Sequence, residues 1–321
     1  MKIVLCEEID KCEAIWQRFV LPECVWDLWD VRKTFIDIYG YPIKFVTAYE
    51  GNKLIAALPL WFNLEEKRFE WISDQWAEGN YPFAENKQIV SEMILSLPGK
   101  VFFDAIRSDK ANLFEEKLER DSDHFGFNLS KRGGNWDGVL LSMPSRKENV
   151  KRNIKSVEKI NPKVFFDRES DLENLFALNI FRMRQKVDKY DDEELSVYES
   201  GDRNQRVIKE LWKRGKNEFR SRIMAVEVSG KVVGVMFNLI WKDKYLQLHR
   251  GEDVLSADGI GSYMNKLVVE DAIKMGCDYV DFCMEEHHWK KNWCDPEAMY
   301  KLTLDNSVLV KKEVHESFSC L

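Results

Sequence analysis

The stretch LSADGIGSYMNKLVVEDAIKMGCDYVDF, residues 255–282, decides how the chain folds. It opens with two glycines one residue apart, continues with the apolar spacing of an amphipathic helix, and ends after Gly276 in a short run typical of a buried strand. The first turn of a helix has unbonded main-chain N–H groups and a partial positive charge. We therefore expect Gly259 and Gly261 to form an anion-binding loop, with a plain glycine-rich turn as the alternative.

The same pattern of elements occurs twice in the chain. The hairpin pattern KFVTAYEGNKLIAALPL (44–60) corresponds to RIMAVEVSGKVVGVMFN (222–238), an offset of 178 residues, 222 minus 44. The same offset aligns two further pairs of segments, 67–73 with 245–251 and 84–104 with 262–282. Each pair reads as the same type of element in both copies. We interpret this as an internal duplication of one α/β unit.

The duplication predicts a chain of the α/β (α+β) class with two domains, at 1–143 and 144–321. The boundary near Pro144 follows a predicted strand, DGVLLSM (137–143). In the second copy we expect helices at about 145–160, 171–186 and 204–215, and after the glycine loop. We expect strands at about 163–167, 221–229, 232–241, 244–250, 278–282 and 299–311.

The first copy serves as an internal control for the glycine loop. The common offset aligns Gly259-Ile260-Gly261 with Tyr81-Pro82-Phe83. Proline has no N–H group to offer, and the flanking aromatic side chains would block close approach. The glycines are therefore not required by the shared fold as such, and we expect a phosphate site at 254–263 in the second copy alone.

The composition is that of a globular protein, with 45% hydrophobic and 32% charged residues in 321. A net charge of −7 argues against nucleic acid as the main partner. No apolar run reaches the roughly 18–20 residues that cross a bilayer, and the acidic N-terminal sequence is unlike a secretory signal. The seven cysteines lack a disulfide-framework spacing. We therefore expect reduced thiols and a cytoplasmic location.

With this order of elements, the second copy resembles a domain of the GNAT superfamily of N-acyltransferases. In that family the loop after the fourth strand carries Q/R-x-x-G-x-G/A and binds the pyrophosphate of acyl-coenzyme A. Here the loop, residues 256–261, reads SADGIG, with Ser256 in place of Arg or Gln and with Asp258 as an added carboxylate.

The whole chain resembles, more narrowly, the tandem FemAB-like branch, which includes proteins of cellulose and exopolysaccharide biosynthesis. Three segments carry this resemblance: SRKENVKRNIKSVEKI (145–160), GIGSYMNKLVVEDAIKMGCDYVDF (259–282) and DFCMEEHHWKK (281–291). The resemblance implies two tandem GNAT-like domains, each a mixed, mostly antiparallel sheet flanked by helices.

The resemblance implies acyl transfer from acyl-CoA, such as acetyl-CoA, to an amine of a small molecule, a sugar or a peptide. It places cofactor contacts in the glycine loop, at Val254, Leu255, Gly259, Ile260, Gly261 and Ser262. Candidate bases at the end of the preceding strand are His249, Glu252 and Asp253. Strand alternation puts Tyr245, Gln247 and His249 on one face, and a satisfied histidine at a partly exposed edge is the alternative.

The acceptor could be contacted from either copy. The candidate contacts are His288, Lys290, Trp76 and Tyr81, and simple packing is the alternative for the two aromatic residues. The spacing C-x3-H-H-x5-C from Cys283 to Cys294 fits no common zinc site, so we expect no metal. The basic helix face carries Lys147, Lys151, Lys155 and Lys159, and is either solvated or in contact with an anionic substrate or tRNA.

Two alternative functions therefore stay open beside acyl-CoA-dependent transfer. An aminoacyl-tRNA donor is known among FemAB-like enzymes, so a peptidyl transferase of that kind is the second. A non-catalytic protein that keeps the fold for binding or as a scaffold is the third.

Overall fold

The computed structural model of the protein describes residues 1–73, 75–143, 145–190, 196–199, 201–285 and 289–307, and the side chains of all of these except 186–190. The chain forms two units. Unit 1 is Met1–Asp123 with Glu297–Leu321, and unit 2 is His124–Pro296. No helix in the described part is both long enough and apolar enough to span a membrane.

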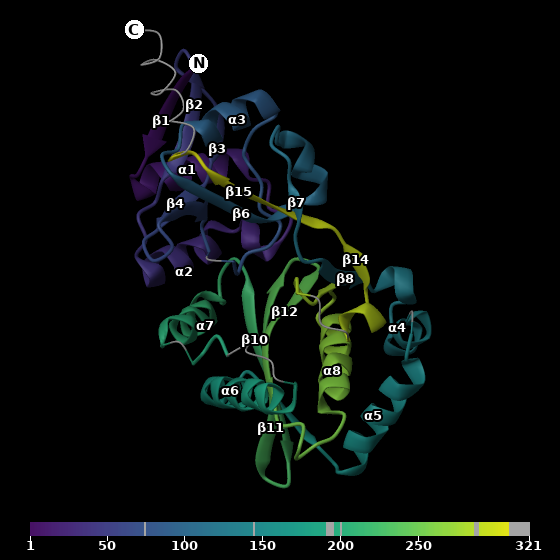
Figure 1. Cartoon of the computed structure of the whole chain (residues 1–321). Helices are drawn as coiled ribbons and strands as arrows, with labels where there is room; N and C mark the ends of the chain where they lie inside the picture. Colours follow the sequence, from purple (N-terminus) through teal and green to yellow (C-terminus); the bar gives the residue numbers. More distant parts are fainter. Residues whose placement is uncertain (74, 144, 191–195, 200, 286–288, 308–321) are drawn as a thin grey trace. The chain divides into compact units, whose positions relative to one another are not determined.

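Unit 1 contains two sheets and three α-helices among its described residues, labelled in Figure 1. The sheets have the strand orders β1-β2-β3 and β4-β5-β6-β15-β7. The strands are β1 (Lys2–Cys6), β2 (Phe45–Glu50), β3 (Lys53–Leu58), β4 (Leu60–Asn63), β5 (Arg68–Trp71), β6 (Lys100–Arg107), β7 (Glu119–Arg120) and β15 (Met299–Asp305). The helices are α1 (Ile9–Phe19), α2 (Trp29–Tyr39) and α3 (Lys87–Leu95), with 3-10 turns at Val25–Asp27 and Ser108–Leu113.

Unit 2 is built on a seven-stranded sheet of order β14-β8-β13-β12-β11-β10-β9. Its strands are β8 (His124–Asn128), β9 (Lys163–Phe166), β10 (Arg220–Val228), β11 (Lys231–Trp241), β12 (Lys244–Glu252), β13 (Tyr279–Asp281) and β14 (Asp295–Glu297). Its helices are α4 (Trp136–Ser142), α5 (Lys147–Lys159), α6 (Asp171–Tyr190), α7 (Arg203–Arg214) and α8 (Ile260–Lys274), with 3-10 turns at Ser130–Arg132 and Lys290–Asn292.

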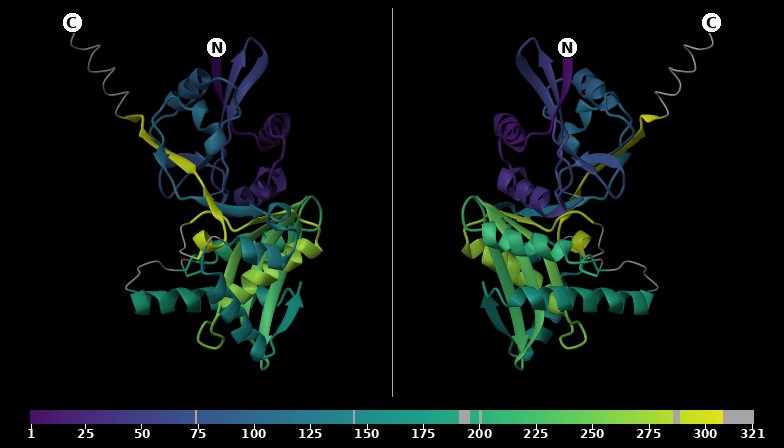
Figure 2. Two further views of the ribbon diagram at one scale, coloured as in Figure 1. Left: turned by 90° about the vertical axis from the view of Figure 1, so that its right-hand side faces the viewer. Right: turned by 90° about the vertical axis from the view of Figure 1, so that its left-hand side faces the viewer.

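The helices of unit 2 cover both faces of its sheet. Helices α6 and α7 lie on one face, and α8 and α5 lie on the other (Figure 1). Figure 2 shows unit 2 from either side, with α8 and α5 toward the viewer in the left view and α6 and α7 in the right view. The apolar core on the α8 side includes Val269 and Ala272 of α8 and Val150 and Ile154 of α5. Each of these side chains comes from the apolar stripe of an amphipathic helix.

The hairpin, the third strand, the crossover helix and the strand after it, which the repeat predicts, are present in both units. Each copy contains an antiparallel hairpin, β2–β3 in unit 1 and β10–β11 in unit 2. Each copy then has a parallel strand pair joined through a helix, β5–α3–β6 in unit 1 and β12–α8–β13 in unit 2. The parallel pairing requires a crossover connection, and the amphipathic helix in each copy supplies it.

Two strands join a different sheet from the one that the predicted boundary at 143/144 assigns them to. Strand β8 precedes that boundary but pairs with β13 in unit 2, and β15 follows the second copy but pairs with β6 in unit 1. The units therefore divide at Asp123/His124 and again at Pro296/Glu297. Hydrogen bonding decides which sheet a strand joins, and the offset between repeats carries no information about that exchange.

The predicted strand DGVLLSM is wrong, because residues 137–142 belong to helix α4 and Met143 is its C-cap. Asn135 caps the helix, and its Oδ1 accepts a hydrogen bond of 2.9 Å from the N–H of Gly138. Only Val139 and Leu140 of the helix are buried, a pair too short to distinguish a helix from a strand by periodicity. The predicted strand at 299–311 is β15 at 299–305, and positions 308–311 lie outside the described residues.

Candidate functional site

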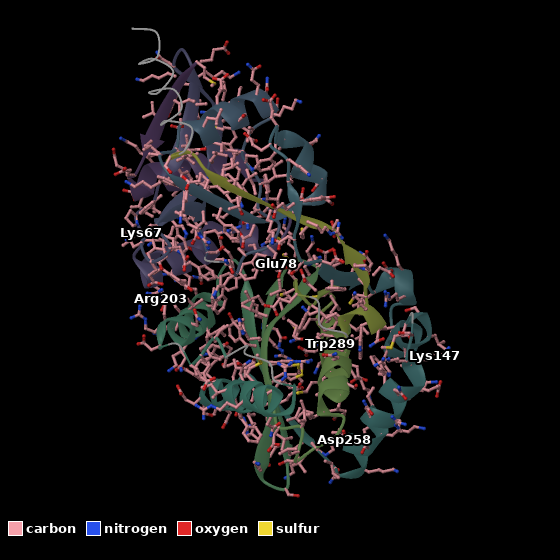
Figure 3. The ribbon with its side chains drawn as sticks, in the orientation of Figure 1. Lys67, Glu78, Lys147, Arg203, Asp258 and Trp289 are labelled. Atoms are coloured by element: carbon pink, nitrogen blue, oxygen red, sulfur yellow. The ribbon has the colours of Figure 1, made fainter. Side chains whose placement is uncertain are left out.

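Helix α8 begins in a loop that leaves main-chain N–H groups unbonded. Among the described residues, the N–H groups of Asp258, Gly259 and Gly261 donate no hydrogen bond. Those of Ile260 and Ser262 are used, by the carbonyls of Ala257 and Gly259. Figure 3 labels Asp258, an exposed residue, just before α8. The unbonded groups lie at the positive end of a 15-residue helix, which favours an anion there.

The structural constraint that favours glycine differs between the two positions of the loop. Gly259 has a φ of 87°, and a Cβ there would lie 2.7–2.8 Å from backbone atoms of Asn153 in α5. Close packing of α5 against α8 therefore requires Gly259 irrespective of any ligand. Gly261 has helical geometry, and a Cβ there would meet Glu252 Oε2 at 3.0 Å. The argument from the first copy thus applies to Gly261 more than to Gly259.

The buried carboxylate of Asp253 holds the start of the loop through hydrogen bonds. Its carboxylate accepts hydrogen bonds from the N–H groups of Leu255 (3.2 Å) and Ser256 (3.0 Å), and from the hydroxyl of Ser256 (2.6 Å). Lys231 Nζ adds an ion pair of 2.7 Å. Burial opposes ionisation of Asp253, but the bonds from Lys231 and Ser256 outweigh it and lower its pKa to about 2. Asp253 is thus a structural anion, and Lys231 places a cation beside the loop.

Strand β12 has an unpaired edge next to this loop. Its parallel pairing with β13 covers only Lys244–Leu246. Residues 247–252 continue the strand, bonded to β11 on one edge and to no described strand on the other. An unpaired strand edge presents main-chain donors and acceptors to a ligand that runs alongside it.

A bulge in β12 changes which side chains share a face. Phe237 pairs with His249 and the next residue, Asn238, pairs with Gln247, so Leu248 is the extra residue. Tyr245 and Arg250 consequently both point toward α8, where Tyr245 Oη bonds Asp271 at 2.9 Å and Arg250 Nη1 bonds Asn265 at 3.2 Å.

The predicted alternation is therefore wrong at His249. Its ring faces the other side of the sheet, with its centroid 5.5 Å from that of Tyr198. An inserted residue reverses the parity of every position that follows it, and no alternation pattern in the sequence reveals the insertion.

Four buried polar atoms on or beside this strand have no hydrogen-bond partner in the described part of the chain. Gln247 Oε1 and Glu252 Oε2 lie on β12 itself, and Tyr198 Oη and Trp289 Nε1 belong to side chains that pack against His249 and Arg250. Each such group costs about 1–3 kcal/mol when left unsatisfied. A polar ligand bound along this strand would complete the hydrogen bonding of these four atoms.

Residues 144–291 match the family model described as an acetyltransferase (GNAT) domain. That range runs from the start of α5 through β13 and includes the glycine loop. Unit 2 contains a GNAT domain. A comparison with curated protein sequences gives no match.

Three solved structures resemble the whole chain. The structure of FemX has a TM-score of 0.58 at 11% identity and covers 97% of this chain and 99% of its own. A protein of unknown function from Bacteroides thetaiotaomicron has a TM-score of 0.55 at 11% identity, covering 94% and 100%. A tandem GNAT protein from the clavulanic acid biosynthesis pathway has 0.51 at 9%, covering 95% and 98%. These likenesses establish the fold, and the predicted tandem GNAT-like architecture is confirmed.

The candidate bases of the GNAT domain differ in their surroundings. Burial lowers the pKa of His249 to about 4, with a small opposing effect from Glu285, so its imidazole is neutral at pH 7. Glu252 is 4% exposed and lies 3.1 Å from Arg182 and 3.5 Å from Arg250. Asp253, as described above, is committed to the loop. His249 is therefore the candidate whose neutral, proton-accepting imidazole predominates at pH 7.

Arg250 is a buried cation of the GNAT domain, and the sequence motif did not indicate it. Burial lowers its pKa to about 10, and nearby Glu252 partly opposes this. Its guanidinium lies 4.6 Å from the centre of the Trp289 ring, a cation–π contact. Arg182 and Arg250 share the single carboxylate of Glu252, so this cluster carries excess positive charge.

The predicted acceptor contacts belong to different units, and each one that is described packs within its own unit. Lys290 is 4% exposed, and its Nζ donates to the carbonyls of Cys283, at 3.1 Å, and Met284. In unit 1, Trp76 packs against Phe35 with ring centres 5.6 Å apart, and Tyr81 packs against Phe83 at 5.7 Å. His288 lies outside the described residues. A role for any of them in acceptor binding stays a prediction.

The remaining loop residues are placed as follows. Val254 and Leu255 are 42% and 78% exposed, Ile260 is fully buried, and the Ser262 hydroxyl lies 3.4 Å from Asn153 Nδ2. Of the predicted cofactor contacts, only Gly259 and Gly261 therefore combine an unbonded N–H with a position at the start of α8.

Proposed function

We propose that the GNAT domain transfers an acyl group from an acyl-coenzyme A thioester to an amine. The observation that carries this proposal is the set of three unbonded N–H groups at the start of α8, next to the unpaired edge of β12. The N–H groups suit a pyrophosphate, and the strand edge suits the amide-containing arm between the pyrophosphate and the thioester. The acceptor class, a small-molecule, sugar or peptide amine, and the cytoplasmic location stay predictions.

The residues present could divide the chemistry as follows. Lys231 and the N–H groups of Asp258, Gly259 and Gly261 bind and orient the donor. A neutral amine attacks the thioester carbonyl and loses a proton, for which the neutral imidazole of His249 is the acceptor. Ser256, bound to Asp253, supplies no charge to the donor, and Lys231 takes the place of the Arg or Gln that the family motif carries there.

A pair of variants at Gly261 isolates the contribution of one N–H group. Gly261→Ala adds a Cβ and keeps the N–H, whereas Gly261→Pro adds carbon atoms and removes it. Proline is tolerated in the first helical turn, where the N–H is unbonded within the helix. Because a hydrogen bond to a charged group contributes about 1.5–3 kcal/mol, we expect Gly261→Pro to bind coenzyme A about 10- to 100-fold more weakly than Gly261→Ala.

Isothermal titration calorimetry of the full chain with coenzyme A measures this difference. Equal affinities for the two variants would show that the N–H group of Gly261 does not bind coenzyme A, which contradicts the proposed role of the loop. Absence of coenzyme A binding by the wild-type chain would contradict acyl-CoA-dependent transfer and favour a binding or scaffold role.

A second candidate is transfer from an aminoacyl-tRNA, and helix α5 is the observation that favours it. Helix α5 packs against α8 beside the glycine loop, through Asn153. Its exposed face carries Lys147, Lys155 and Lys159 (Lys147 is labelled in Figure 3). None of these three lysines forms an ion pair with a described residue, whereas Lys151 pairs with Glu148.

Neutralising part of this face tests the second candidate. If tRNA binds along α5, the double variant Lys155→Gln/Lys159→Gln should reduce the slope of log affinity against log salt concentration by about 1–2. Lys209→Gln in α7, which removes an ion pair with Glu173, is the control. No tRNA binding at low salt, or the same slope in both variants, would reject this candidate.

A further inference from the structure

Tyr198 carries a hydroxyl group that the fold does not use. The residue is 2% exposed, and its Oη has no hydrogen-bond partner among the described residues. A phenylalanine would provide the same ring for packing without an unsatisfied polar atom. The hydroxyl therefore has no explanation in packing, and it lies beside strand β12, where the unsatisfied polar atoms of Gln247, Glu252 and Trp289 also lie.

The backbone of Tyr198 is tied to that strand by a chain of hydrogen bonds. The N–H of Tyr198 donates to Ser196 Oγ at 3.2 Å, and the Ser196 hydroxyl donates to Asn179 Oδ1 at 2.7 Å. Asn179 Nδ2 in turn donates to the main-chain carbonyl of Arg250 at 2.7 Å. This connection reaches β12 two residues after the bulge, so the position of Tyr198 is fixed relative to the bulged segment.

The ring of Tyr198 is held on two sides. It lies 4.8 Å from the ring of Phe176 in α6 and 5.5 Å from the ring of His249. Burial raises the pKa of Tyr198 well above its ordinary value, so the hydroxyl keeps its proton. A phenol that is held in place and stays protonated can act as a hydrogen-bond donor, and it is unsuited to act as a base.

We propose that Tyr198 is a catalytic residue whose hydroxyl donates a hydrogen bond to the carbonyl oxygen of the acyl group during transfer. The inference rests on the proposed acyl transfer and adds a donor for its negative charge. As the nucleophile bonds to the carbonyl carbon, the C=O electron pair moves onto the oxygen, which Tyr198 stabilises. The C=O bond then re-forms and the C–S bond breaks. The proton that His249 accepts from the nucleophile goes to the departing sulfur, which gives the free thiol.

The test compares two tyrosines whose hydroxyls differ in their partners. Tyr198→Phe removes a hydroxyl with no partner, and Tyr245→Phe removes one bonded to Asp271 at 2.9 Å. The assay follows release of free thiol from acetyl-CoA, first with water as the nucleophile and then with a panel of amino acids, amino sugars and short peptides. Water suffices in principle, because its attack places the same charge on the carbonyl oxygen.

For Tyr198→Phe we expect kcat to fall about 100-fold, with unchanged coenzyme A affinity by calorimetry and an unchanged or higher melting temperature. For Tyr245→Phe we expect a lower melting temperature and a kcat within about 3-fold of the wild-type value, because its lost bond is structural.

Three results would overturn the assignment. The first is a wild-type kcat in Tyr198→Phe. The second is a loss of kcat in that variant accompanied by a matching loss of coenzyme A affinity or melting temperature, which would make the hydroxyl structural. The third is coenzyme A binding by the wild-type chain without thiol release with any nucleophile. Failure of the wild-type chain to bind coenzyme A at all is a different result, because it removes the proposed function itself and this inference with it.

Discussion

The corresponding segments of the two copies differ in their main-chain hydrogen bonds. In unit 1 the segment 80–83 bonds to two strands. Asn80 bridges to β6, with its N–H 2.9 Å from the carbonyl of Ala105, and Phe83 exchanges hydrogen bonds of 2.8 and 2.9 Å with Ala57 of β3. In unit 2 the corresponding segment, 258–261, bonds to neither strand and begins helix α8. One copy closes this part of the fold with its own main chain, and the other leaves the donors open.

The side chains that hold the two segments carry opposite charges. In unit 1 the buried Arg32 donates to the carbonyl of Ile72 at 2.6 Å and to Asn80 Oδ1 at 2.9 Å. In unit 2 the buried Asp253 holds the loop by accepting hydrogen bonds. An anion site needs free N–H groups, and a carboxylate that fixes the start of the loop keeps the later N–H groups available. The two copies thus differ in whether their own main chain uses these N–H groups.

The largest expected effect comes from the residue that closes unit 1. Phe83 is 4% exposed, and its ring lies 5.2 Å from that of Trp16 and 6.0 Å from that of Phe19. We expect Phe83→Ala to lower the free energy of unfolding by about 3–5 kcal/mol, because it removes a buried aromatic ring and leaves a cavity. Urea denaturation followed by circular dichroism measures the loss.

Leu95→Ala is the control for Phe83→Ala, since Leu95 is 53% exposed and should change stability by less than about 0.5 kcal/mol. A loss below about 1 kcal/mol for Phe83→Ala would show that the closure of unit 1 does not depend on that ring. The variant should also leave coenzyme A affinity unchanged, because the proposed donor site belongs to the other copy.

The sequence predicted the elements of both copies but not all of their contacts. Hydrophobic periodicity and the common offset located both hairpins, both crossover helices and the parallel strands. The bulge at Leu248 was not predictable, because an extra residue leaves the composition of a strand unchanged. The bonds that Phe83 makes to Ala57 join residues 26 positions apart, 83 minus 57, and no local pattern encodes them.

For the candidate site, too, the sequence predicted what a local pattern encodes and missed what depends on three-dimensional contacts. The glycine motif located the start of α8, because a loop of this kind has a local sequence signature. Tyr198, Arg182 and Arg250 were missed, since their importance comes from burial beside β12 and from missing or shared partners, which only the three-dimensional contacts show. Asp253 was predicted as a base, and the structure places it in the loop as a hydrogen-bond acceptor.

A smaller effect should separate the two roles of glycine in the loop of unit 2. Gly259→Ala places a Cβ within 2.7–2.8 Å of backbone atoms of Asn153, and we expect it to cost about 2–3 kcal/mol of stability. Gly276→Ala is a matched control, with a similar φ of 75° against 87° and open space around the added Cβ. It should cost only about 1 kcal/mol, from the backbone conformation alone. Equal losses by thermal or urea denaturation would mean that contact with α5 does not constrain Gly259, and would restore the ligand as the reason for that glycine.

The smallest effect tests whether a carboxylate organises the open loop, and it depends on pH. The pKa of Asp253 is lowered from 3.8 to about 2 in the folded chain, so its contribution is present above about pH 4 and is lost as the pH falls through about 2. We expect Asp253→Asn to reduce stability by about 1–2 kcal/mol at pH 7, with the difference from wild type shrinking between pH 4 and pH 2. Asp258→Asn, at an exposed position, should change stability little at either pH. A difference for Asp253→Asn that stays constant from pH 7 to pH 2 would show that the charge is not what fixes the loop, and the contrast with Arg32 in unit 1 would then rest on shape alone.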